Sequence, residues 1–170
     1  MQQKRLNGTV AFLRFIRHRK NLQDFYNFCS KYGYTLPHQP LGGVLFHGSQ
    51  KLQSTLNPNT SVGRNDELEQ SAFVYTTDDP NYAIFLAILN LKNGSASVNA
   101  TAKNTTLVVN LDFVNGPSKF KKGYVHIVAR SSFKKVKNRE YKVSQQVKVL
   151  FTIPVIPADL TTPIYIQTES

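Results

Sequence analysis

Short apolar runs with strand-like patterning dominate the second half of the chain and restrict the folds that are open to it. Tyr124 and His126 alternate with Val125 and Ile127 in one of them, which predicts a sheet with two different faces. We expect three strands in this half, at residues 106–114 (TLVVNLDFV), 123–130 (GYVHIVAR) and 147–155 (VKVLFTIPV).

The first half mixes helix and strand signals. Residues 8–32 carry apolar side chains mostly at helical spacing, which predicts one or two helices. Two short runs follow that are typical of strands, GGVLFHG at residues 42–48 and SAFVYTT at residues 71–77. The polar residues 53–71 between them and the small polar residues 93–106 predict loops.

A helix is expected directly after the second strand-like run. Asp78 or Asp79 is a suitable N-cap, and Pro80 falls in the first helical turn. Helices that come first and strands that come mostly later, joined by short connections, favour a single α+β domain. The 170 residues therefore divide into a helical N-terminal extension over residues 1–40 and a core over residues 41–170.

The sequence lacks the motifs of several common kinds of site. Cys29 is the single cysteine, so we expect neither an internal disulfide nor a cysteine zinc site. The four histidines, at positions 18, 38, 47 and 126, have no ligand spacing, so no metal is expected. No phosphate-binding glycine loop or serine-hydrolase elbow occurs. The basic N-terminus lacks an apolar signal-peptide core and no run is long enough to span a membrane, which favours a cytoplasmic location.

Positive charge is the strongest feature of the composition. The chain has 21 Lys and Arg against 10 Asp and Glu, a formal net charge of +11. Eight of the cations lie between Lys119 and Arg139, where there is no acidic residue. Such a stretch attracts polyanions, either nucleic acid or an acidic protein. An ordinary solvated face is the alternative.

Three residues on separate strand-like segments carry the functional hypothesis. His47 lies in the sequence HGS, Tyr75 in VYTTDD and Glu140 in EYKVSQQV. Taken singly, each residue has an ordinary interpretation: a histidine at a strand end, a tyrosine in the core and a surface carboxylate among lysines. In this order they resemble the ADP-ribosyltransferase superfamily, specifically the His-Tyr-Glu branch of the poly(ADP-ribose) polymerases and diphtheria-type toxins. The resemblance covers residues 42–160.

The resemblance implies a fold and a site. The fold would be two small, mostly antiparallel sheets that form a cleft for NAD+, which is the substrate; no metal is required. The carboxylate of Glu140 would stabilise the oxocarbenium-like transition state and hold the ribose 2′-hydroxyl. The implied catalytic residues are His47, Tyr75 and Glu140, and the implied NAD+-binding residues are His47, Gly48, Ser49, Tyr75 and Tyr82.

The individual NAD+ contacts also follow from the resemblance. His47 would form a hydrogen bond with the adenosine ribose, and the backbone of Gly48 would bind the nicotinamide amide. Tyr75 would stack on the nicotinamide ring, with Tyr82 closing its other face. Core packing is the alternative interpretation of both tyrosines.

Two departures narrow the expected activity. Asn138 stands two residues before Glu140, where arginine-specific relatives have Glu, so arginine is not the expected acceptor. The chain has no room for the helical regulatory domain of the polymerases, so we expect a mono-ADP-ribosyltransferase, such as a toxin or effector, acting on a macromolecule. The alternative is a non-catalytic basic module, either an inactivated relative or an unrelated nucleic-acid-binding domain. An RNA 2′-phosphotransferase fits less well, because its Arg/His set is not recognisable.

Overall fold

The structure of the protein is a computed structural model, and it describes residues 44–58, 72–101, 105–160 and 162–168. The helices predicted for the N-terminal extension lie outside these residues. So does most of the loop predicted over residues 53–71.

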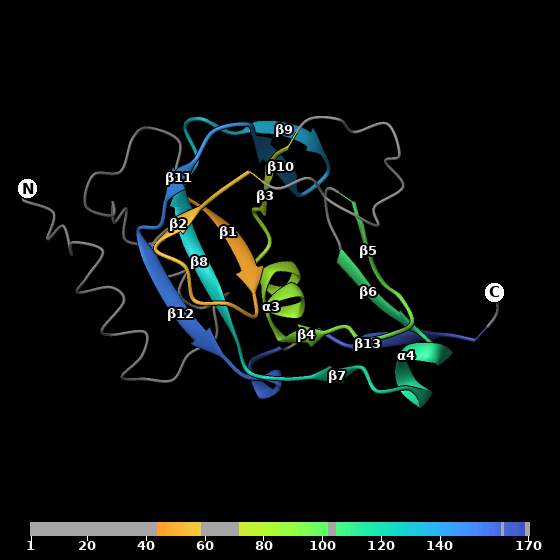
Figure 1. Cartoon of the computed structure of the whole chain (residues 1–170). Coiled ribbons are helices and arrows are strands. Elements are labelled where there is room, and N and C mark those ends of the chain that lie inside the picture. The colour runs from red at the N-terminus through yellow and green to blue at the C-terminus, as the bar shows by residue number, and fades with distance from the viewer. Residues whose placement is uncertain (1–43, 59–71, 102–104, 161, 169–170) are drawn as a thin grey trace, which may run out of the picture.

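An antiparallel sheet of six strands lies on one side of helix α3 (Pro80–Ile88) (Figure 1). The strand order is β12-β8-β1-β3-β10-β9, and every neighbouring pair is antiparallel. The strands are β1 (Val44–Ser49), β3 (Val74–Thr77), β8 (Gly123–Ala129), β9 (Lys134–Lys137), β10 (Glu140–Val143) and β12 (Phe151–Val155).

A smaller sheet of three strands lies on the far side of helix α3 from β1 (Figure 1). Its central strand is β6 (Thr105–Asn110). This strand pairs in parallel with β13 (Ile164–Gln167) and antiparallel with β5 (Ala96–Ala100). Two further ribbons join β2 (Thr55–Leu56) to β11 (Val147–Lys148) and β4 (Leu89–Asn90) to β7 (Lys119–Phe120).

Helix α3 (Pro80–Ile88) packs between the two sheets. Asp79 is its N-cap, since the carboxylate accepts a hydrogen bond from the backbone N–H of Asn81 at 2.9 Å. Ile84 packs with the core on β1 and β8, whereas Phe85 packs with β6 and Phe113. A short helix that is apolar on nearly all sides is suited to this buried position. The remaining helical turns are α4 (Leu111–Asn115) and η1 (Pro157–Asp159).

The fold class is confirmed as α+β with several antiparallel sheets. The strands expected near residues 42–48, 71–77 and 123–130 and the helix capped by Asp79 are present. Among the described residues, no helix combines the length and the apolar character needed to cross a membrane.

Three element predictions were wrong in part. The loop predicted over 93–106 contains β5, an edge strand in which half-buried Ala and Val residues alternate with exposed Ser97 and Asn99. The strand predicted over 106–114 stops at Asn110, because that side chain accepts from the N–H of Phe113 and starts α4. The run 147–155 is divided into β11 and β12, which belong to different sheets.

Candidate active site

The site begins at a gap between two neighbouring strands of the large sheet. Strand β1 pairs with β8 along its whole length but with β3 at a single register position, Phe46 opposite Thr77. Nδ1 of His47 lies 2.7 Å from the carbonyl oxygen of Tyr75. A carbonyl only accepts, so Nδ1 carries a proton and donates this hydrogen bond. The imidazole thus supports the end of β3 where the strand pairing stops.

The backbone of Gly48 faces this gap. The carbonyl of Ile127 on β8 accepts from the N–H of Leu150, so Ile127 directs its backbone groups toward β12. Residues two apart on an antiparallel strand share this direction, so Val125 does the same. Gly48 lies opposite Val125 and therefore directs its N–H and C=O away from β8, toward β3. A donor and an acceptor side by side are suited to binding a carboxamide.

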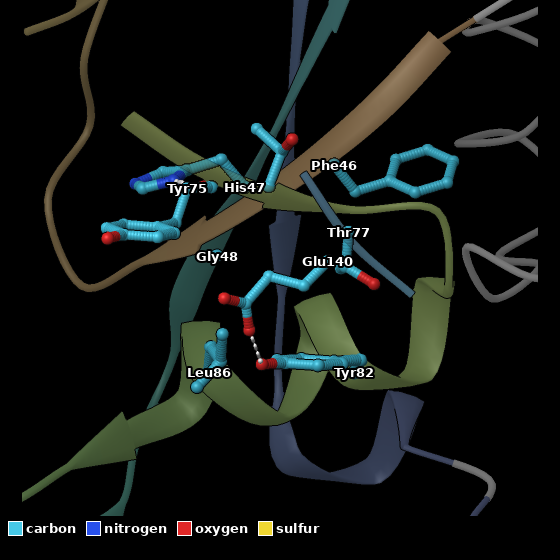
Figure 2. A pocket seen from close by; sticks show the side chains of 9 residues that line it. Phe46, His47, Gly48, Tyr75, Thr77, Tyr82, Leu86 and Glu140 are labelled. Atoms are coloured by element: carbon cyan, nitrogen blue, oxygen red, sulfur yellow. Dashed lines mark hydrogen bonds between the residues drawn. The ribbon is translucent and has the colours of Figure 1, made fainter. Parts of the chain in front are cut away.

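Glu140 approaches the same gap from the other side of β3. It is the first residue of β10, lies opposite Thr77 and is 5% exposed. Its carboxylate accepts a hydrogen bond from the hydroxyl of Tyr82 on α3 at 3.2 Å (Figure 2). The exposed Lys137 ammonium lies 3.8 Å from the same oxygen. These contacts give the carboxylate a neutral hydrogen-bond donor and a nearby cation at the surface.

One pocket of about 210 Å³ joins these groups. Five of the six site residues predicted from the sequence line it, and they come from β1, β3, α3 and β10 (Figure 2). Ser49 does not line it; its hydroxyl accepts from the N–H of Lys51 instead. The lining residues are Phe46, His47, Gly48, Tyr75, Thr76, Thr77, Tyr82, Leu86 and Glu140.

Sequence reasoning missed four lining residues, and two of them had a readable signal. Thr77 follows Tyr75 by two residues, which places both on one face of a strand. Leu86 follows Tyr82 by four residues, which places both on one face of a helix. Phe46 and Thr76 had no such signal, because they alternate along their strands with His47 and Tyr75 and reach the pocket through long-range strand pairing.

His126 is buried beneath the site and stays neutral. It is fully buried on β8, opposite His47. Its Nδ1 lies 3.3 Å from the carbonyl of His47, and its Nε2 accepts from the N–H of Gln53 at 3.0 Å. Burial, reinforced by repulsion from His47, lowers the pKa of His126 to about 4, although its hydrogen bond to the His47 carbonyl opposes the shift. The neutral ring therefore links β1 to the loop that follows it.

The low pKa of His126 predicts a specific sensitivity to acid. Its folded pKa of about 4 lies below the ordinary histidine value of 6.5, so its contribution to stability is complete above pH 6.5 and is lost as the pH falls toward 4. The loss reaches about 3 kcal/mol, at about 1.4 kcal/mol per pKa unit. Urea unfolding between pH 4 and 7 should therefore show a flatter pH dependence for His126→Gln than for the wild type. Parallel curves would contradict the assignment.

A second pocket is also lined by Tyr82. It measures about 180 Å³ and is bordered by β5 and by the turn between β9 and β10. The side chains of Asn99, Asn138 and Lys137 provide amide and ammonium groups along it. Tyr82 lines both pockets and donates a hydrogen bond to Glu140, so this side chain is shared by the two spaces.

The lysine-rich stretch is not one continuous surface. Strand β8 separates Lys121 and Lys122 from β9, and its seven residues span about 20 Å. All four residues of β9 are exposed, and this strand pairs with β10, which begins at Glu140. Only the β9 part of the stretch is therefore adjacent to the pocket.

Two remaining observations concern metal ions and known proteins. Within the described part of the chain, no group of three or more His, Cys, Asp or Glu side chains is arranged to hold a metal ion. No protein-family model, curated protein or solved structure matches the chain.

Proposed function

We propose that the protein is a mono-ADP-ribosyltransferase with the ADP-ribosyltransferase-like fold, using NAD+ as its substrate. The observation that carries the proposal is the convergence of His47, Tyr75 and Glu140 on one pocket. These are the residues, in the same sequence order, on which the His-Tyr-Glu resemblance rests.

The nicotinamide half of NAD+ fits the groups around the gap in the sheet. The N–H and C=O of Gly48 would bind the carboxamide, and the phenol ring of Tyr75 would stack on the pyridinium. A pocket of about 210 Å³ is smaller than the roughly 300–1,000 Å³ typical of sites that enclose a whole ligand. It would therefore take the nicotinamide and its ribose, with the adenosine extending past the His47 imidazole.

Glu140 supplies the electrostatics of bond cleavage. The glycosidic C1′–N bond breaks, the electron pair leaves with neutral nicotinamide, and positive charge develops on the ribose. The carboxylate would stabilise that charge and accept a hydrogen bond from the 2′-hydroxyl. A nucleophile of the acceptor then forms the new bond at C1′ and releases its proton to water. The second pocket, also lined by Tyr82, would admit that nucleophile on the side of Asn138.

The proposal is tested by incubating the protein with NAD+ labelled in the adenylate and measuring free nicotinamide and label bound to protein or nucleic acid. We expect enzyme-dependent nicotinamide release, with label transferred when the correct acceptor is present. Absence of both, in a folded sample that binds no NAD+, would overturn the proposal.

A basic binding module is the second candidate, and the exposed lysines of β9 favour it. It differs from the enzyme in one measurable respect: it would bind a polyanion without releasing nicotinamide from NAD+. Both functions could use the same cationic strand, which in the enzyme would hold an acidic acceptor next to Glu140.

The position of β9 predicts which lysines matter for a polyanion. Charge reversal of Lys134 and Lys135 should weaken duplex binding and flatten its salt dependence by roughly 0.9 log–log units for each phosphate that is no longer neutralised. The matched reversal of Lys121 and Lys122, which lie at the other end of β8, should weaken binding of the same duplex less. Filter binding across a salt series measures both. Equal weakening by the two pairs would contradict a special role of β9, and no effect of either pair would show that β9 is an ordinary solvated surface.

A further inference from the structure

The backbone around Glu140 is irregular on both sides. Arg139, immediately before it, has φ of 65°, in the left-handed region that side chains other than glycine rarely adopt. The register between β9 and β10 shifts between Glu140 and Tyr141. β10 keeps a regular register with β3, whereas its pairing with β9 is irregular at Glu140. Contacts made by the flanking residues therefore contribute to the direction of the Glu140 side chain.

A single carboxylate binds the residues on both sides of Glu140. Oδ1 of Asp78 lies 3.4 Å from Nη1 of Arg139, and Oδ2 accepts from the hydroxyl of Tyr141 at 3.2 Å. That hydroxyl in turn accepts from Nη2 of Arg130 at 2.6 Å, and the Arg130 guanidinium lies 4.7 Å from the Tyr141 ring centre. Tyr141 is 4% exposed, so the cluster is anchored in the core.

Asp78 also lies just before helix α3, which carries Tyr82, the hydrogen-bond donor to Glu140. It follows the last residue of β3 and precedes Asp79, the N-cap of α3. Tyr82, three residues into that helix, donates its hydroxyl to Glu140. One short segment thus fixes both the chain that presents the carboxylate and the helix that binds it.

We propose that Asp78 is a positioning residue, which orients the Glu140 carboxylate toward the pocket by holding Arg139 and Tyr141. This inference rests on the proposed function. Asp78 does not line the pocket and touches no reacting atom; it acts through Glu140.

The kinetic test uses Asp78→Asn, which keeps the shape of the side chain but removes its charge. Nicotinamide release should fall roughly 10- to 100-fold, as expected for a misplaced catalytic group, while the KM for NAD+ stays within about twofold. The matched control is Asp112→Asn on the exposed side of α4, which should leave both constants unchanged. Tyr141→Phe, which keeps the buried ring, should give a smaller loss of the same kind.

A double variant separates positioning from general damage. If Asp78 acts through Glu140, adding Asp78→Asn to Glu140→Gln should cause no further loss of activity, since residues that act as a unit are not additive. A full additional loss, or a rise in KM alone, would overturn the proposal.

A readout that needs no activity distinguishes this proposal from the proposed function. The side-chain carboxyl carbon of Glu140 can be followed by NMR in the full-length protein. Asp78→Asn should shift this resonance and speed amide exchange at Arg139 and Tyr141, whereas Asp112→Asn should do neither. If the wild type releases no nicotinamide, the enzyme proposal fails and this spectrum alone decides. An unchanged Glu140 resonance in Asp78→Asn would then overturn the positioning role.

Discussion

Glu140→Gln is expected to release nicotinamide from NAD+ about 100- to 1,000-fold more slowly than the wild type, with NAD+ affinity retained. The substitution keeps the size and hydrogen-bonding capacity of the side chain but removes the charge that stabilises the developing oxocarbenium ion. Loss of one such electrostatic group costs about 2.7–4 kcal/mol of transition-state stabilisation. Binding should survive, because the carboxylate contributes most when charge appears on the ribose.

Initial rates of nicotinamide release and the dissociation constant for NAD+ measure the two effects separately. Asp112→Asn makes the same carboxylate-to-amide change on α4, away from the pocket, and should behave as the wild type. Equal turnover in Glu140→Gln and the wild type would remove Glu140 from the mechanism.

Gly48→Ala is expected to lower the free energy of unfolding by about 3 kcal/mol, the upper end of overpacking costs. A Cβ at this position would lie 2.6 Å from the backbone N of Ala87 and still closer to the carbonyl oxygen of Ala83. Helix α3 would have to move away from β1 and so disturb the core that the two elements share. Because the atoms in conflict belong to the backbone, trimming the neighbouring Leu86 to Ala should not restore stability.

Thermal unfolding tests this prediction, with a fall in Tm of about 6–12 °C expected for a domain of this size. Ser97→Ala, at an exposed position of β5, is the control and should stay within about 0.5 kcal/mol of the wild type. If Gly48→Ala were as stable as this control, the close approach of α3 to β1 would be incorrect.

Local patterns in the sequence were sufficient for three of the four elements that carry the site, whereas β10, which carries Glu140, was not among the expected strands. Apolar β-branched and aromatic runs marked β1 and β3, and Asp79 with Pro80 marked the start of α3. These signals are short-range, because they depend on backbone preferences of adjacent residues. The order of His47, Tyr75 and Glu140 in the sequence then led to the hypothesis that three distant segments meet at one site.

Other features depend on long-range pairing and had no local signal. The gap between β1 and β3 arises because pairing stops at Phe46, which no sequence pattern records. The restraint on Glu140 needs Asp78, 62 residues earlier in the chain. The lysine-rich stretch is continuous along the sequence. In the structure, however, β8 lies within this stretch and separates its first lysines from those of β9 by the length of a strand.

The most direct test of the account is a crystal structure with a non-hydrolysable NAD+ analogue in which carbon replaces the ribose ring oxygen. The account predicts the nicotinamide ring stacked on Tyr75, its carboxamide bonded to the backbone of Gly48, and the 2′-hydroxyl within hydrogen-bond distance of the Glu140 carboxylate. A dinucleotide bound elsewhere, with the pocket between β1, β3 and α3 empty, would contradict it.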